Sequence, residues 1–163
     1  MKQHQVYIIA GSNIHPRKKF IDQSIHLISQ LNGLKIDNKS RKYESDPWGF
    51  EAAVPFINQA IQLSTTMDAY TLLKKLLAIE QILGRQRTLS GYQSRTIDLD
   101  ILFFDNDLIQ TEDLTIPHPG IPERRFVLEP LHELAADFVH PVSNKTIHTL
   151  LYECNDNGKV NPL

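Results

Sequence analysis

The sequence is poor in cysteine, in long apolar runs and in excess charge of either sign. Its one thiol, Cys154, excludes a disulfide within the chain, and no group of cysteines and histidines has the spacing of a structural zinc site. The apolar run near the start, residues 6–10, is too short for the core of a signal peptide or for a membrane span. We therefore expect a cytoplasmic protein that does not enter a membrane.

The charge balance excludes a further class of partner. The 17 lysine and arginine residues are offset by 19 aspartate and glutamate residues, for a formal net charge of −2, so no overall positive field attracts nucleic acid. Any phosphate binding must come from a local cluster. With 163 residues, 41% of them hydrophobic and 22% charged, the chain has the size and composition of one globular domain over residues 1–163, and we expect a monomer.

Several familiar catalytic patterns are also missing. There is no Gly-x-x-x-x-Gly-Lys-Ser/Thr loop and no Gly-x-Gly-x-x-Gly, and Gly11-Ser12-Asn13 is too short to replace either. His132-Glu133 has no second histidine at the spacing of a zinc peptidase. Nothing in the pattern nominates a serine or cysteine nucleophile, so covalent catalysis through such a residue is not expected.

Hydrophobic periodicity predicts an alternation of strands and helices in the first two thirds of the chain. The expected strands cover residues 6–10, 34–43, 56–65 and 96–104, and the expected helices cover residues 16–31 and 70–83. Asp68 is suited to cap the second helix, and Gly84 is suited to end it.

The last third of the chain is less regular. We expect residues 108–116 to return as a partner strand of 96–104, and residues 117–122, which contain three prolines, to be irregular. Further elements are expected over residues 123–135 (helix), 139–147 (extended) and 149–153 (helix). The order β-α-β-β-α-β with these additions predicts an α+β fold, a ferredoxin-like sandwich in which helices pack on a mainly antiparallel sheet.

The most informative segment is the strand that contains Asp98 and Asp100. Residues two apart on a strand share one face, so the two carboxylates point the same way, roughly 6 to 7 Å apart, while Ile97, Leu99 and Ile101 point into the core. Carboxylates on so apolar a strand need compensation, which cations supply. Magnesium is the natural choice because it takes hard oxygen ligands, usually alongside substrate phosphates.

By itself, an Asp-x-Asp pair is also compatible with two aspartates on the water-facing side of a half-exposed strand. The neighbouring arginines favour a functional site. Arg85 and Arg87 follow the second helix, and Arg95 lies three residues before Asp98. Guanidinium groups beside two metal-binding carboxylates match what a polyphosphate-transfer site requires.

Glu80 and His118 are weaker candidates. Glu80 lies near the end of the helix over 70–83 and could accept hydrogen bonds from a ribose or an adenine, although a surface glutamate is the plainer interpretation. His118 lies in the proline-rich loop with Arg124 close behind it. An imidazole held in a rigid loop could donate a hydrogen bond to a phosphate.

Taken together, these segments resemble the 6-hydroxymethyl-7,8-dihydropterin pyrophosphokinases of folate synthesis. The resemblance covers nearly the whole chain and rests on the order and spacing of several fragments. These fragments are Ala10-Gly11-Ser12-Asn13, Tyr43-Glu44-Ser45-Asp46-Pro47-Trp48-Gly49, Phe56-Ile57-Asn58-Gln59-Ala60, Glu80 with Gly84-Arg85-Gln86-Arg87, Arg95-Thr96-Ile97-Asp98-Leu99-Asp100-Ile101, and Pro117-His118 with Arg124-Arg125-Phe126.

The resemblance implies transfer of pyrophosphate from Mg-ATP to the hydroxymethyl group of the pterin, with release of AMP. It implies that Asp98 and Asp100 hold two magnesium ions at the ATP phosphates and that Arg85 and Arg95 stabilise the migrating group. The positions that match the nucleotide site are Glu80, Arg87, Ile101, His118 and Arg124. The positions that match the pterin pocket, in which Phe56 and Phe126 would sandwich the ring and Asn58 would meet its amide edge, are Ser45, Pro47, Trp48, Phe56, Asn58 and Phe126.

Two alternatives to this function remain open at the level of sequence. One is another two-metal phosphoryl or nucleotidyl transferase, which the aromatic pair and Asn58 disfavour. The other is a ferredoxin-like module that binds RNA, which would need basic and aromatic residues interleaved on its sheet. The carboxylates of Asp98 and Asp100 would instead repel a phosphate unless a metal ion intervened.

Overall fold

The structure is a computed structural model that describes residues 2–47, 54–85 and 95–163. Its larger sheet contains β1 (His4–Ser12), β2 (Leu34–Lys39), β3 (Tyr43–Ser45), β4 (Phe56–Thr65), β5 (Asp98–Phe104) and β8 (Val160–Pro162). A separate small sheet contains β6 (Ile109–Gln110) and β7 (Thr115–Ile116). The helices are α1 (Arg17–Ser29), α2 (Ala69–Ile82), α3 (Arg125–Ala135) and α4 (Ile147–Glu153), with a 3₁₀ turn at Ile121–Glu123.

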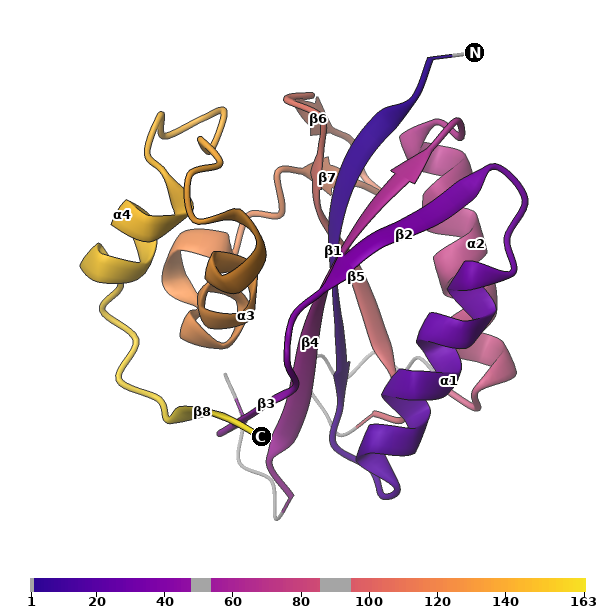
Figure 1. Cartoon of the computed structure of the whole chain (residues 1–163), viewed down its shortest axis with the longest axis horizontal. Coiled ribbons are helices and arrows are strands. Elements are labelled where there is room, and N and C mark those ends of the chain that lie inside the picture. Colours follow the sequence, from indigo (N-terminus) through magenta and orange to yellow (C-terminus); the bar gives the residue numbers. More distant parts are fainter. Residues whose placement is uncertain (1, 48–53, 86–94) are drawn as a thin grey trace.

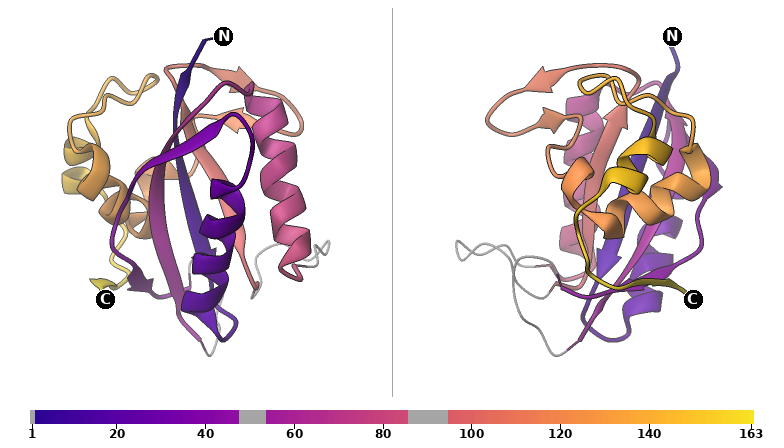
Figure 2. Two further views of the ribbon diagram at one scale, coloured as in Figure 1. Left: turned by 45° about the vertical axis from the view of Figure 1, so that its right-hand side comes forward. Right: turned by 90° about the vertical axis from the view of Figure 1, so that its left-hand side faces the viewer.

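The larger sheet is antiparallel and has helices on both faces. Its strand order is β5-β1-β4-β3-β8, with β2 also paired to β4. Helices α1 and α2 cover one face, and α3 and α4 cover the other (Figures 1 and 2). The predicted α+β sandwich is therefore confirmed, and its central order is β-α-β-β-β-α-β, with one strand more than predicted.

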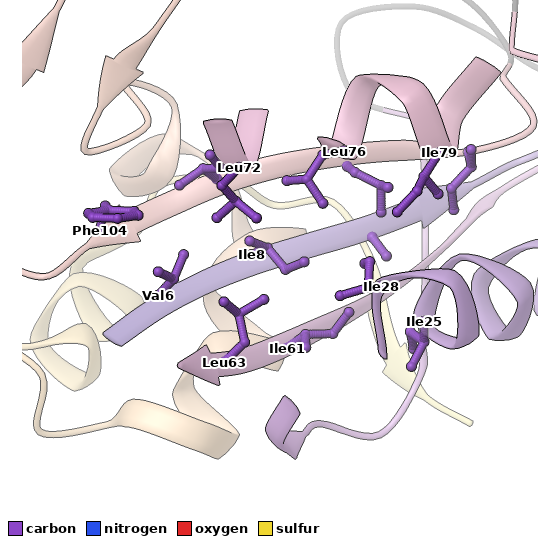
Figure 3. Packing of buried hydrophobic residues seen from close by; sticks show 14 of the residues in the cluster. Val6, Ile8, Ile25, Ile28, Ile61, Leu63, Leu72, Leu76, Ile79 and Phe104 are labelled. Atoms are coloured by element: carbon purple, nitrogen blue, oxygen red, sulfur yellow. The ribbon is translucent and has the colours of Figure 1, made fainter. Parts of the chain in front are cut away.

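Alternating residues of the central strand β1 form the two halves of the core. Val6 and Ile8 face α1 and α2, where they pack with Leu72 and other aliphatic side chains (Figure 3). Tyr7 and Ile9 face α3 and α4. Because successive residues of a strand point to opposite faces, the continuous apolar run of β1 marks a strand that is covered on both sides.

A β-bulge in β5 adjusts which of its residues reach the second core. Ile8 pairs with Ile101 and Tyr7 pairs with Phe103, so Leu102 is the extra residue. As a result Leu102 and Phe103 both pack on the α3 side of the sheet. Strand β5 thereby fills the core beneath α3 and α4 with its second half, while its first half carries the two aspartates.

Several sequence predictions hold closely. The strand predicted over 56–65 is β4, with the same bounds. Asp68 caps α2 by accepting a hydrogen bond from the backbone N–H of Thr71, and Gly84 follows the helix with a φ of +88°, a conformation that favours glycine.

Other predictions are corrected. Residues 108–116 do not pair with β5 as a partner strand, because β6 and β7 within this range pair with each other. The predicted strand over 34–43 is two strands, β2 and β3, and β8 was not predicted. The expected extended piece over 139–147 contains only an isolated bridge between Val139 and Thr146 before α4. No helix within the described ranges is long and apolar enough to cross a membrane.

Leu72 of α2 is fully buried against the sheet, so truncating its side chain should lower the stability of the protein considerably. Leu72→Ala should lower the free energy of unfolding by about 2 to 5 kcal/mol, because the cavity that forms can collapse only in part. The matched control is Leu108→Ala, since Leu108 is 65% exposed, and its effect should be below about 0.5 kcal/mol. Urea denaturation measures both; equal effects would contradict the packing.

Candidate active site

A cavity opens on the α3 side of the sheet. Its floor follows the pairing of three strands. Gly11 of β1 lies between Asp98 of β5 and Asn58 of β4. A β-carbon at position 11 would lie 2.8 Å from Oδ1 of Asn58, so glycine leaves room for the side-chain amide of Asn58 at the cavity.

Asp98 is held by two arginines. Nη1 of Arg85 donates to Oδ1 of Asp98 at 2.6 Å, and Nη1 of Arg95 donates to Oδ2 at 2.8 Å. Arg85 reaches β5 because Gly84 ends α2 and turns the chain toward the sheet. The two guanidinium groups balance the carboxylate and fix its orientation at the cavity.

Glu80 belongs to the same network from inside the protein. Its side chain is buried, and its Oε2 accepts hydrogen bonds from Nη1 of Arg85 at 2.9 Å and from the backbone N–H of Leu99 at 2.7 Å. The interpretation of Glu80 as a surface residue is therefore wrong. A buried carboxylate costs free energy unless it is paired and hydrogen-bonded, and here both conditions hold.

Asp100 lies next to Asp98 along the strand and also lines the cavity. Burial, together with the negative charges of Asp98 and Glu80, raises the pKa of Asp100 to about 8. This carboxyl group therefore lacks the compensation that Asp98 receives from the arginines. A bound cation would supply it.

The two aspartates have the chemistry of a magnesium site. Both offer carboxylate oxygens on one side of the strand, and magnesium usually binds through one or two carboxylates plus substrate phosphates. Within the described ranges, no group of three or more His, Cys, Asp or Glu side chains could hold an ion. The donor set thus fits an ion that shares its ligands with a phosphorylated substrate, and not a closed protein cage.

His118 faces the cavity as a neutral imidazole. Its Nδ1 accepts a hydrogen bond from the backbone N–H of Gly120 at 3.1 Å. Burial and the positive charge of Arg124 lower the pKa of His118 to about 4. Because Nδ1 is an acceptor in the neutral ring, the proton lies on Nε2, which makes that nitrogen a hydrogen-bond donor.

Aromatic and amide groups line the part of the cavity formed by β3, β4 and α3. Nδ2 of the buried Asn58 donates to Oγ of Ser45 at 2.7 Å, which orients the amide. The guanidinium of Arg95 lies 5.9 Å from the ring centre of Phe56, and that of Arg124 lies 6.0 Å from the ring centre of Phe126. Flat faces and an oriented amide suit a planar heterocycle with polar edges.

Known protein families and solved structures resemble this chain. The family model described as 7,8-dihydro-6-hydroxymethylpterin-pyrophosphokinase matches residues 7–136. The chain belongs to this family.

Among the pyrophosphokinase relatives, a 2-amino-4-hydroxy-6-hydroxymethyldihydropteridine pyrophosphokinase of Bacillus subtilis is 41% identical over 78% of this chain and 76% of its own length. A protein of the same name from Haemophilus influenzae is 36% identical over 96% of this chain and 98% of its own length. The folic acid synthesis protein fol1 of Pneumocystis carinii is 41% identical over 87% of this chain, which corresponds to only 19% of that protein.

Solved structures agree on the fold. The HPPK-DHPS of Plasmodium falciparum with pterin and p-hydroxybenzoate has a TM-score of 0.74 at 17% identity, over 94% of this chain. The match covers 42% of that longer chain. At this identity the likeness supports the pyrophosphokinase fold alone.

The cavity brings together most of the site residues predicted from the sequence. Those that line it are Ser45, Phe56, Asn58, Arg95, Asp98, Asp100, His118, Arg124 and Phe126. Arg85 and Glu80 lie behind Asp98, as described above. The side chain of Ile101 lies in the core, and Pro47 does not line the cavity. Trp48 and Arg87 lie outside the described residues.

Five lining residues were not predicted. These are Ile9, Gly11, Asp46, Leu102 and Val127. The period of two along a strand could have identified Leu102, which shares a face with Asp98 and Asp100. Val127 follows Phe126, and Asp46 follows Ser45. The positions of Ile9 and Gly11 in the cavity depend on which strand pairs with each edge of β1, and a single sequence does not show this pairing.

Asn13 is a further residue that sequence reasoning missed. It is buried, and its Oδ1 accepts a hydrogen bond from the backbone N–H of Arg95 at 2.7 Å. The backbone N–H of Asn13 in turn donates to the carbonyl of Arg95 at 3.2 Å. The end of β1 therefore fixes the backbone from which Arg95 reaches Asp98. The signal was the asparagine directly after Gly11-Ser12.

The raised pKa of Asp100 predicts a pH-dependent stability in metal-free protein. Between about pH 4 and pH 8 the folded state keeps a proton on Asp100 that the unfolded chain releases, so this group destabilises the fold as the pH rises. The loss is at most about 1.4 kcal/mol per pH unit. In Asp100→Asn that loss should be absent.

Urea denaturation of both proteins in the presence of a chelator, from pH 5 to pH 9, measures this difference. The stability of the wild type relative to Asp100→Asn should fall up to about pH 8 and then level off. Parallel stability profiles would show that Asp100 is already ionised in the folded protein.

Proposed function

We propose that this chain transfers pyrophosphate from Mg-ATP to the hydroxymethyl group of 6-hydroxymethyl-7,8-dihydropterin, which gives the pterin diphosphate and AMP in folate biosynthesis. Membership of the pyrophosphokinase family supports this reaction and both small-molecule substrates. One observation supports the assignment to particular residues. A single cavity is lined by Asp98 and Asp100 and also by Phe56, Asn58 and Phe126.

The charged side of the cavity is proposed to bind the polyphosphate. Arg85 and Arg95 already present guanidinium groups to a carboxylate, and phosphate oxygens match the same fork geometry. His118 can donate from Nε2, and Arg124 lines the cavity close to it. The remaining nucleotide contacts are proposed for Glu80, Arg87 and Ile101, by resemblance to the family.

Asp98 and Asp100 are proposed to hold two magnesium ions. Bound there, the ions would neutralise charge on the phosphates and orient them. Asp100 must lose its proton to act as a ligand, and Asp98 is oriented by Arg85 and Arg95. Asp98 and Asp100 would therefore present carboxylate oxygens as metal ligands on one side of β5.

The aromatic side of the cavity is proposed to bind the pterin. Phe56 and Phe126 would cover the two faces of the ring, and Asn58, oriented by Ser45, would meet its amide edge. Pro47 and Trp48 complete the proposed pocket by resemblance to the family.

The reaction needs positioning and charge neutralisation more than covalent participation by the protein. The pterin hydroxyl oxygen attacks the β-phosphorus of ATP, the bond from that phosphorus to the oxygen of the α-phosphate breaks, and AMP leaves. Arg85 and Arg95 would stabilise the charge on the migrating group. We further propose that one catalytic domain spans residues 1–163 and that it acts as a cytoplasmic monomer.

The direct test is to incubate the protein with Mg-ATP and 6-hydroxymethyl-7,8-dihydropterin and to separate the nucleotide products, with a control lacking the pterin. AMP that forms only with the pterin supports pyrophosphoryl transfer. ADP would identify a simple kinase, and the absence of any nucleotide product would refute the proposed substrate pair.

Removing either aspartate should nearly abolish turnover. Asp98→Ala and Asp100→Ala each delete a proposed metal ligand where several kcal/mol of charge stabilisation is needed, so AMP formation should fall by about 100-fold or more while the fold is kept. Asp137→Ala, at an exposed position outside the cavity, serves as the control. Initial rates and circular dichroism measure both properties, and near-normal turnover in either variant would rule out the metal assignment.

Phe126→Ala should weaken pterin binding more than nucleotide binding, because one stacking face is lost. The expected decrease in pterin affinity is about five- to tenfold, which corresponds to roughly 1 kcal/mol. Titration of the pterin in the presence of a non-hydrolysable ATP analogue measures this affinity. Unchanged pterin affinity would contradict the aromatic sandwich.

A further inference from the structure

The segment after α4, residues 154–162, contacts two elements that carry cavity residues. It runs from the end of α4 to β8, which lies beside β3 (Figure 1). Strand β3 carries Ser45, and the start of α3 carries Phe126; both residues line the cavity. The family model ends at residue 136, before this segment. We call residues 154–162 the C-terminal tie.

At one end, the C-terminal tie holds the first residue of α3. The backbone N–H of Arg125 donates to Oδ2 of Asp156 at 3.0 Å, and Nε of Arg125 donates to the carbonyl of Asp156 at 2.9 Å. Nη2 of Arg125 donates to the carbonyl of Cys154 at 3.2 Å. The side chain of Arg124, the capping residue of α3, accepts no such bond. Asp156 therefore provides, from a distant part of the chain, the acceptor that a helix N-terminus needs.

The carboxylate of Asp156 also shapes the C-terminal tie itself. Its Oδ1 accepts a hydrogen bond from the backbone N–H of Gly158 at 2.8 Å. One carboxylate thus joins the start of α3 to the turn that leads into β8. Loss of this group would loosen both the helix start and the turn.

At the other end, the C-terminal tie pairs with β3. Glu44 lies opposite Asn161, the backbone N–H of Leu163 donates to the carbonyl of Lys42 at 2.9 Å, and that of Asp46 donates to the carbonyl of Lys159 at 3.3 Å. Strand β3 is only three residues long. Without β8 its outer edge would have no strand partner, so β8 contributes much of the hydrogen bonding that holds Ser45 in place.

We propose that the C-terminal tie positions the pterin pocket by fastening β3 and the start of α3 to each other, an inference that rests on the proposed function. The phosphate-binding side has separate support, because Asp98 is fixed by Arg85 and Arg95. Loosening the tie should therefore weaken pterin binding and leave nucleotide binding nearly unchanged. Asp156 and Asn161 are positioning residues, since neither lines the cavity.

Asp156→Ala tests the contact with α3. It removes the acceptor for the backbone N–H of Arg125. The matched control is Glu129→Ala, because Glu129 also pairs with Arg125, at 3.4 Å, but does so from within α3. Pterin affinity, measured with a non-hydrolysable ATP analogue and magnesium present, should fall about tenfold in Asp156→Ala and stay within about twofold of wild type in the control.

Asn161→Pro tests the contact with β3. Position 161 lies midway between the hydrogen bonds Leu163–Lys42 and Asp46–Lys159 of the antiparallel pair, so its backbone N–H faces β3, and proline removes that donor. Asn161→Ala keeps the backbone N–H and is the control. Again a loss of about tenfold in pterin affinity is expected for the proline variant alone, with nucleotide affinity within about twofold.

Amide hydrogen exchange of the ligand-free proteins separates this inference from the proposed function. Residues 43–46 should lose protection in Asn161→Pro and residues 125–128 in Asp156→Ala, each relative to its control. Unchanged protection, unchanged pterin affinity, or an equal loss of nucleotide affinity would overturn the role of the tie. A wild-type protein that neither binds the pterin nor forms AMP would refute the proposed function, and hydrogen exchange would still decide whether the tie holds both elements.

Discussion

The ion network around Asp98 is the constraint on which the candidate site depends. Two arginines donate to this carboxylate, one just after α2 and one just before β5, while buried Glu80 accepts from the same Nη1 of Arg85 that donates to Asp98. Guanidinium groups bind both carboxylates and phosphates, so under the proposed function a polyphosphate would offer Arg85 and Arg95 acceptors like those of Asp98. The side chains that orient Asp98 would then also bind the substrate.

Asp100 shows the opposite situation within two residues of Asp98. Its carboxyl group is desolvated and lies near two other negative charges, so its proton is retained to about pH 8. Ionising this carboxyl group therefore costs the folded protein free energy. Groups with such shifted pKa values are often found where a ligand supplies the compensating charge. The contrast between the two aspartates supports the proposed cation site on β5 more strongly than the Asp-x-Asp spacing does alone.

The sequence predicted the elements that have strong local signals. Helix α2 has a clear apolar period with Asp68 and Gly84 at its ends, and β4 coincides with a stretch of residues that favour strands. Prediction failed where pairing is decided by distant residues. Nothing local to residues 108–116 shows that β6 and β7 pair with each other, and β8 is recognisable as a strand only because it lies beside β3.

The same distinction applies to the site. The period of two along a strand placed Asp98 and Asp100 on one face of the sheet. The nearby arginines could be recognised as candidates because guanidinium groups suit a phosphate site. Glu80 could not be placed, because its carboxylate is buried against another element, β5, where it accepts a hydrogen bond from the backbone N–H of Leu99. The roles of Asn13 and Gly11 depend on which residues lie beside them once β1 pairs with β4 and β5. This pairing is a property of the whole sheet and cannot be read from the segment itself.

The face of the sheet that carries the cavity also decides against the RNA-binding alternative. An RNA-binding module of this fold class stacks bases on aromatic side chains of an open sheet. Here Tyr7 and Phe103 on that face are 5% and 1% exposed beneath α3 and α4, and Phe56 lies in the cavity. The cavity on this face is lined by Asp98 and Asp100 and also by Phe56, Asn58 and Phe126. Helices α3 and α4 thus cover the part of the sheet that an RNA-binding module of this fold class would leave open to bases.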